Sequence, residues 1–342
     1  MKHANISLFV PHAGCPHQCS FCNQKTISGS VKILTPEDVI KTLSDAVLDG
    51  NNPENTEIAF FGGSFTAVDR DYMVSLLEAA KPFIDDGYFS GVRISTRPDA
   101  IDDEVLALLK KYSVTSIELG AQSTDEDVLI LNKRGHTREQ IINASVLIKK
   151  RGFSLGLQMM TGLLGDTPEK TIRTAKDIIS LKPDTVRIYP TIVLEGTLLG
   201  DLYKEGKYSP QTVEEAAAVC AVLLKMFYEN EIKVIRLGLH SGGNVEDGYL
   251  AGPYHPAFGE ICESKIYLEE AFRVIKEKYP QNSHNLCSLT QKPRLTLYVN
   301  EREVSKMTGQ KACNKAVLYR AGYDVTVKGI RNLKKYEIRV EL

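Results

Sequence analysis

The chain has 342 residues, of which 43% are hydrophobic and 25% are charged, and its formal net charge is −1 at pH 7. This composition is ordinary for a soluble globular protein, and seven cysteines, an odd number, do not indicate a disulfide framework. No apolar run approaches the ~18 residues that span a bilayer, and the short N-terminal run stops at Pro11, which excludes a membrane span and a signal peptide. We therefore expect a cytoplasmic protein.

Short β-like runs alternate with amphipathic helical patterns over the first 240 residues. This alternation predicts a parallel sheet with right-handed crossovers, and six or seven such units favour a full or partial barrel over an open sheet. A helix is expected from Thr35 and Pro36, a typical start, to Gly50, a typical stop. The expected strands span 6–10, 58–63, 91–96, 116–122, 154–162 and 184–190, with a possible seventh at 234–239.

Three of the seven cysteines, Cys15, Cys19 and Cys22, lie in a C-x3-C-x2-C loop directly after the first expected strand. A zinc site commonly takes two distant C-x2-C pairs, whereas an iron–sulfur cube takes one thiolate per iron. Three thiolates therefore leave one iron open to a non-protein ligand, and we interpret the loop as the binding site of such a cluster. A zinc site with His12 or His17 as fourth ligand, or buried unpaired thiols, are the alternatives.

Glycine and polar residues stand at the C-terminal ends of the expected strands, where parallel α/β sheets form their sites. These ends read GGSF at 62–65, STRPD at 95–99, GAQS at 120–123, MTGLLG at 160–165 and YPT at 189–191. The sequence therefore predicts one common site at this edge of the sheet.

The pattern changes after residue 240, so we predict domains at 1–240, 241–290 and 291–342. The middle segment is a connecting stretch with a helix, and its loop GPYHPAFGE contains His255, a candidate catalytic acid or base or substrate ligand. A buried structural histidine is the alternative. The last segment reads β-α-α-β and carries 12 Lys+Arg against 5 Asp+Glu, whereas the rest of the chain has a balance of −8. This basic surplus indicates an anionic partner.

The cysteine loop resembles that of the radical S-adenosylmethionine (SAM) superfamily, and FFGGSFT at 60–66 resembles its glycine motif. Within that superfamily the chain resembles the catalytic subunit of the Elongator complex, through blocks in the same order. These blocks are ISTRPD at 94–99, ELGAQSTDEDVL at 118–129, NKRGHT at 132–137, MMTGLLGDT at 159–167 and a longer stretch at 187–210. The resemblance implies a partial (β/α)6-type barrel, SAM as cofactor, and a 4Fe–4S cluster on the three cysteines.

The resemblance also implies which residues contact SAM. Arg134 would pair with the SAM carboxylate, which a guanidinium fork suits. Gln158 stands where the Elongator subunit has a histidine, and each polar residue taken singly is also an ordinary strand-end hydrogen bonder. The residues expected to contact SAM are Gly62, Gly63, Ser95, Gln122, Arg134 and Gln158.

The segment 291–342 resembles a KH-type RNA-binding module, in which a glycine loop clamps the nucleic-acid backbone. Its loop, TGQKACNK, keeps Gly309 but has Ala312 in place of the second glycine. A small α/β cap with solvated lysines is the alternative. The expected RNA contacts are Lys306, Lys311 and Lys315, with Lys328, Arg331, Lys334 and Lys335 as further candidates.

These features together predict a radical SAM enzyme that cleaves SAM reductively to a 5′-deoxyadenosyl radical and modifies a tRNA or rRNA nucleotide. Ferredoxin or flavodoxin is the expected electron donor. The residues after the barrel show no acetyl-CoA phosphate loop, so acetyl-CoA is not an expected partner. Because no long apolar run is present, a membrane is not expected either. The alternatives are a radical SAM enzyme acting on a small molecule or tetrapyrrole, and a non-catalytic iron–sulfur or zinc redox sensor.

Overall fold

The computed structural model describes residues 4–10, 18–23, 32–50, 53–239, 245–279 and 292–342. The chain divides into two compact units: Met1–Thr212 with Phe227–Tyr254, and Val213–Met226 with His255–Leu342. The three-part division drawn from the sequence stays a prediction. None of the helices in the described ranges combines the length and the apolar character that a bilayer span requires.

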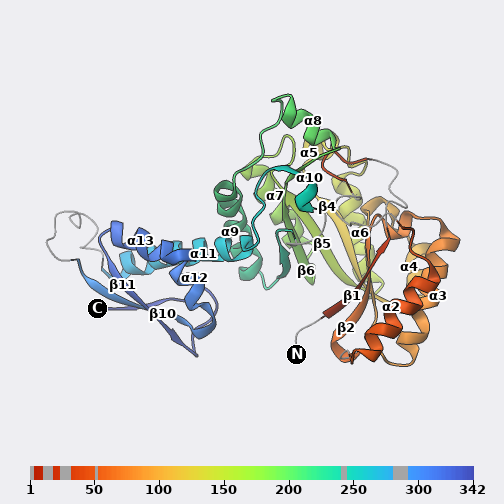
Figure 1. Cartoon of the computed structure of the whole chain (residues 1–342), viewed down its shortest axis with the longest axis horizontal. Coiled ribbons are helices and arrows are strands. Elements are labelled where there is room, and N and C mark those ends of the chain that lie inside the picture. Colours follow the sequence, from red (N-terminus) through yellow and green to blue (C-terminus); the bar gives the residue numbers. More distant parts are fainter. Residues whose placement is uncertain (1–3, 11–17, 24–31, 51–52, 240–244, 280–291) are drawn as a thin grey trace. The chain divides into compact units, whose positions relative to one another are not determined.

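The first unit is built on a seven-stranded sheet in the order β1-β2-β3-β4-β5-β6-β8, in which every neighbouring pair is parallel (Figure 1). The predicted partial α/β barrel is therefore confirmed, including its seventh strand. The strands are β1 (Ala4–Val10), β2 (Thr56–Gly62), β3 (Val92–Thr96), β4 (Val114–Gln122), β5 (Ser154–Thr161), β6 (Thr185–Pro190) and β8 (Lys233–Leu237).

Each crossover helix of the first unit begins at a residue that caps it. Thr35 accepts a hydrogen bond from the Asp38 amide and forms a capping box, and Gly50 ends this helix with a φ of 77°, as the sequence predicted. The helices are α2 (Pro36–Leu48), α3 (Arg70–Asp85), α4 (Asp103–Lys111), α5 (Glu126–Leu131), α6 (Arg138–Lys150), α7 (Pro168–Ser180) and α8 (Leu198–Lys204). A two-stranded antiparallel ribbon, β7 (Val193–Leu194) with β9 (Tyr249–Ala251), and the short α10 (Val245–Gly248) complete the unit.

The two faces of the sheet differ in chemistry because side chains alternate along each strand. One face is apolar, and its side chains, such as Phe60, Ile94 and Leu119, are fully buried. The alternate positions on the same strands carry Arg93 and Glu118, which are also buried. The interior of the partial barrel is therefore lined with charged side chains, which the sequence analysis did not predict.

These interior charges form one hydrogen-bonded network. Arg187 donates to both oxygens of Glu118, at 2.7 and 2.9 Å, and Arg93 bridges Glu118 and Glu57 at 3.1 and 2.8 Å. Gln158 also donates to Glu118, at 2.9 Å. Burial alone would raise the pKa of Glu118, but the Arg187 charge and these hydrogen bonds hold that pKa below its usual range. The carboxylate thus stays ionised and fixes three side chains of the barrel wall.

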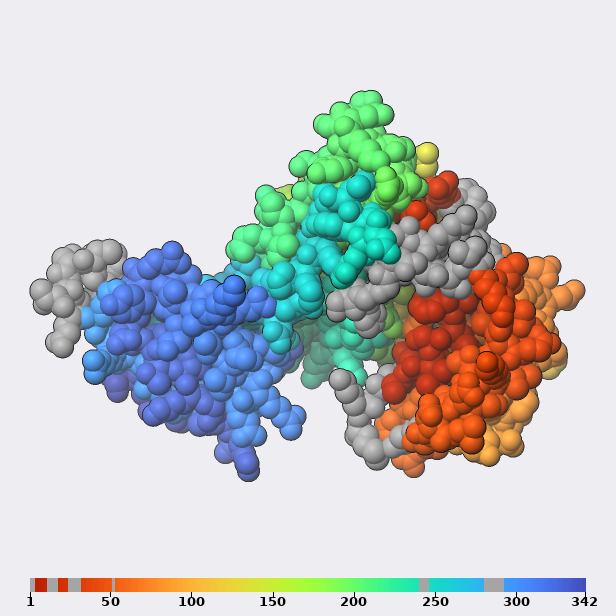
Figure 2. Space-filling model, viewed as in Figure 1, coloured from red at the N-terminus to blue at the C-terminus, as the bar shows by residue number. Residues whose placement is uncertain are grey.

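The second unit contains the part of α9 (Val213–Glu229) up to Met226, the long α11 (Phe258–Lys278) and a three-stranded sheet. Its residues 292–342 are blue in Figure 2. Its sheet has the order β11-β10-β12, with β10 parallel to β11 and antiparallel to β12. The expected β-α-α-β order is confirmed. The elements are β10 (Arg294–Asn300), α12 (Val304–Thr308), α13 (Cys313–Arg320), β11 (Asp324–Ile330) and β12 (Arg339–Glu341).

Replacing Glu118 by glutamine should destabilise the first unit, because it leaves the half-buried Arg187 without a carboxylate partner at a cost of about 3–5 kcal/mol. We expect the melting temperature to fall by roughly 6–12 °C in differential scanning fluorimetry. The matched control is Glu195→Gln, which removes an exposed ion pair to Lys204 at 3.4 Å and should shift Tm by less than about 3 °C. Equal shifts in the two variants would contradict a stabilising role for the network.

Candidate functional site

The cysteine loop is described from residue 18 to residue 23, so Cys19 and Cys22 are described and Cys15 lies outside the described residues. Two main-chain contacts anchor it: Ser20 donates its amide to the Asn132 carbonyl at 3.1 Å and accepts the Leu199 amide at 2.8 Å. The Ser20 hydroxyl also donates to the Asn132 side chain at 2.6 Å. The end of α5 and the start of α8 thus hold the loop in place.

Arg134 links this loop to the end of β4. Its guanidinium donates to the Cys19 sulfur at 2.9 Å and to the Gly120 carbonyl at 2.7 Å, and the residue is only 7% exposed. Its neighbours Lys133 and Gly135 both have left-handed backbone, with φ of 53° and 70°. The third nitrogen of the guanidinium, Nε, is buried and has no hydrogen-bond partner among the described residues. The site therefore holds a buried cation whose Nε is free to donate to a ligand.

Gln122 ends β4 in a strained conformation beside Arg134. Its φ is 64°, which is uncommon for a residue other than glycine, and the β4–β5 register shifts between Gly120 and Gln122. Its Oε1 is buried without a partner in the described part of the chain. At Gly120 an added Cβ would come within 3.0 Å of the Gln122 amide nitrogen and 3.4 Å of the Arg134 guanidinium. Small size at Gly120 therefore leaves room for both side chains.

The glycine pair at the end of β2 packs against the end of β1. Gly62 has a φ of 113°, and a Cβ there would lie 2.6 Å from the Val10 carbonyl oxygen. The Gly63 amide donates to the same oxygen at 3.0 Å. Glycine is thus required at position 62 because β1, the strand that leads into the cysteine loop, lies so close. The contact of Gly62 and Gly63 with SAM stays a prediction.

Two of the predicted SAM contacts, Ser95 and Gln158, lie close together in the barrel interior. The Gln158 amide nitrogen is 3.5 Å from the Ser95 hydroxyl, and its stronger hydrogen bond goes to Glu118. The charged network therefore fixes the orientation of one of the predicted SAM contacts.

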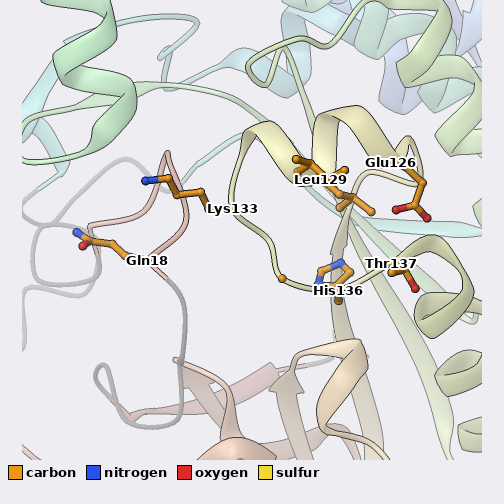
Figure 3. A pocket seen from close by; sticks show the side chains of 8 residues that line it. Gln18, Glu126, Leu129, Lys133, His136 and Thr137 are labelled. Carbon is orange, nitrogen blue, oxygen red and sulfur yellow. The ribbon is translucent and has the colours of Figure 1, made fainter.

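Sequence reasoning missed His136, although this residue stands in the block NKRGHT. Its Nε2 lies 3.2 Å from the Ala121 carbonyl oxygen, and its Nδ1 is buried without a partner among the described residues. Burial, and next the positive charge of Arg134, lower the pKa of His136 to about 4. Figure 3 shows Gln18, Lys133 and His136 around a cavity of about 630 Å³ beside the cysteine loop. A neutral imidazole is thus held close to the site.

His255 and the predicted RNA-contacting lysines belong to the second unit. His255 accepts the Ala257 amide on Nδ1 at 3.0 Å, a local contact at the start of α11, and its catalytic role stays a prediction. Lys306 is paired with two carboxylates, those of Glu263 and Glu303.

Two family models match the chain. Residues 9–178 match the model of the radical SAM superfamily, and residues 183–268 match the radical SAM C-terminal domain. The chain belongs to the radical SAM superfamily. The first match contains the cysteine loop, the glycine pair and Arg134, so the residues that build the site are those of the family domain.

The similar curated proteins are longer than this chain. The tRNA uridine(34) acetyltransferase of Methanocaldococcus jannaschii is 32% identical over 256 residues, which are 63% of this chain and 47% of that protein. Human Elongator complex protein 3 is 28% identical over 197 residues, 52% of this chain and 36% of that protein. The chain thus spans about half, or less, of the length of these relatives. The solved Methanocaldococcus infernus Elp3 with an N-terminal deletion shares the fold, with a TM-score of 0.61 at 21% identity over 81% of this chain and 64% of that one.

Radical SAM enzymes use a 4Fe–4S cluster and SAM, and the described residues of this site fit both groups. Thiolates are the ligands that iron–sulfur clusters take, and Cys19 and Cys22 stand in one anchored loop. Among the described residues no three metal ligands lie together, and the third expected ligand is Cys15. The unused Arg134 donor and Gln122 acceptor suit the charged carboxylate and amino ends of SAM. When bound and reduced, the cluster supplies the electron that cleaves SAM to a 5′-deoxyadenosyl radical.

Cys19→Ser should remove one cluster ligand, because a hydroxyl is a poorer iron ligand than a thiolate. After anaerobic reconstitution we expect less bound iron and sulfide per chain, and loss of the charge-transfer absorbance of the cluster. The control is Cys313→Ser, an exposed cysteine of the second unit, which should bind iron as the unaltered chain does. Equal iron content in both variants would contradict the assignment.

His136 should make stability depend on pH, because the fold favours its neutral form. Its pKa falls from 6.5 in the unfolded chain to about 4 in the fold, so this contribution is complete above pH 6.5 and is lost as the pH falls toward 4. In His136→Gln, urea unfolding between pH 7 and pH 4 should lose a pH-dependent contribution of up to about 3 kcal/mol. An unchanged pH slope in this variant would show that His136 does not titrate as described.

Proposed function

We propose that this radical SAM enzyme modifies a nucleotide of RNA, and that tRNA is its substrate. One observation carries the proposal: the barrel is similar over 256 residues to proteins that act on tRNA uridine 34. The blocks that carry the likeness lie at the strand ends that form the site. The basic surplus in residues 291–342 supports the same choice, because an RNA substrate is a polyanion.

Each residue of the site has its own role in this proposal. The three cysteines would hold the cluster, and Arg134 would hold the SAM carboxylate while its own position depends on Gly120 and Cys19. Gln158, fixed by Glu118, would position the ribose end. Buried side chains around the site exclude water, which protects a reactive radical from side reactions. Ferredoxin or flavodoxin would supply the electron.

Acetyl transfer is not part of this proposal. Both family models that match the chain are radical SAM models, and they end at residue 268. The proposal therefore concerns only the chemistry that the barrel performs, and His255 enters it as a candidate acid or base for the substrate.

The test is a comparison of RNA nucleosides from a deletion strain and its parent by liquid chromatography and mass spectrometry. We expect one modified tRNA nucleoside to disappear and its precursor to accumulate in the deletion strain. Expression of the unaltered chain should restore it, while the Cys19→Ser variant should not. An identical nucleoside profile in tRNA and rRNA of both strains would overturn the proposal.

A further inference from the structure

We propose that the second unit binds RNA on one face of α13, formed by Lys311, Lys315, Tyr319 and Arg320 and called here the α13 face. The choice of RNA as the ligand rests on the proposed function. The location rests on the ion pairs, the shape and the exposed ring of this unit, which single out one part of its basic surface.

Several basic side chains of the second unit are paired with carboxylates. Lys306 and Lys335 both pair with Glu263, and Arg331 pairs with Glu301 at 3.2 Å. A lysine held by a carboxylate has little remaining attraction for a phosphate, because its charge is already compensated. Two of the seven basic candidates named from the sequence, Lys306 and Lys335, therefore hold Glu263 within the unit, whereas Arg331 forms an exposed ion pair.

The cations of the α13 face are different. Lys311, Lys315 and Arg320 form no ion pair with any described residue, and all three line a cavity of about 640 Å³. One carboxylate, Asp324, also lines the cavity, and it lies 3.6 Å from Arg294. The cavity therefore carries an excess of positive charge, which is the electrostatic pattern of a phosphate-binding surface.

Tyr319 adds an aromatic surface to these cations. The residue is 53% exposed, and the Lys292 ammonium lies 3.3 Å from the centre of its ring. Lys292 also donates to the Tyr319 carbonyl at 2.6 Å, so the cation is fixed at the ring. An exposed ring among cations is the arrangement on which unpaired bases stack while phosphates meet the charges.

The loop before α13 holds Lys311 in an unusual backbone conformation. Lys311 and Ala312 both have left-handed φ, 50° and 61°, a conformation that favours glycine. Gly309, with a φ of 78°, leaves no room for a side chain, since a Cβ would lie 2.5 Å from the Cys313 sulfur. Ala312 thus adopts the backbone that a second glycine would allow, and the strain places Lys311 at the cavity.

The cations and the exposed Tyr319 ring together favour RNA with unpaired bases over other polyanions. Single-stranded and looped RNA offers both phosphates and free base faces, whereas a duplex covers its base faces. An acidic protein could meet the cations, but Tyr319 would then lack a stacking partner. A flat lipid surface cannot follow a cavity lined by short side chains such as Ala312 and Ala316.

The experiment compares two triple variants of the full chain that lose the same charge. The first replaces Lys311, Lys315 and Arg320 by glutamine, and the control replaces Lys276, Arg302 and Arg339 by glutamine, which are exposed in the same unit and are not among the expected RNA contacts. Binding of fluorescein-labelled bulk tRNA is followed by anisotropy from 50 to 200 mM KCl. We expect the first variant to bind about 10–100-fold more weakly and to reduce the salt slope by about 2, since each single-strand phosphate contact contributes about 0.7.

Two single variants test the ring. Tyr319→Ala should weaken tRNA binding by roughly tenfold through lost stacking, whereas Tyr319→Phe keeps the ring and should bind as the unaltered chain does. Melting temperatures of all variants check that the second unit stays folded. Equal weakening by the two triple variants would overturn the proposal, because net charge alone would then explain binding. Tighter binding to phosphatidylglycerol vesicles than to tRNA would overturn it as well.

The outcome is separable from that of the proposed function. If the deletion strain lacks a modified nucleoside and the first triple variant still binds tRNA normally, the docking inference fails alone. If no nucleoside differs but the first triple variant loses tRNA binding while its control does not, the docking inference stands and the proposed reaction fails.

Discussion

The contact between Arg134 and the cysteine loop is the interaction on which the site depends. One guanidinium joins the Cys19 sulfur to the Gly120 carbonyl, so the loop after β1 and the end of β4 form one structure. Left-handed residues on both sides of Arg134 and the positive φ of Gln122 are the backbone cost of this junction. Its result is a buried cation and a buried amide oxygen, both with hydrogen-bonding capacity that a ligand can use.

A second network, of charged side chains, lies in the interior of the barrel. Glu118 holds Arg187, Arg93 and Gln158 in one network, and Gly156 makes room for it, since a Cβ there would lie 2.7 Å from the Glu118 side chain. A fully bonded polar network specifies one arrangement of its members, because every alternative leaves a buried charge unpaired. Gln158, one of the predicted SAM contacts, is thus fixed by this network.

Local patterns were sufficient to predict the strands, their parallel order and the edge that carries the site. They follow from alternation, capping residues such as Thr35 and the spacing of the cysteines. The side-chain contacts of the site could not be predicted from local patterns, because Arg134 and Cys19 are 115 positions apart in the chain. For the same reason the sequence could not show that the fold brings Glu263 from α11 to Lys306, whose contact with RNA stays a prediction.

The central claim is that this site generates a radical and directs it at RNA. Its most direct test is the yield of 5′-deoxyadenosine from the cluster-loaded protein with SAM and dithionite, with and without tRNA from the deletion strain. We predict that 5′-deoxyadenosine forms and that this tRNA raises its rate several-fold, while tRNA from the parent strain does so less. A cluster-loaded protein that forms no 5′-deoxyadenosine with either tRNA would contradict the account.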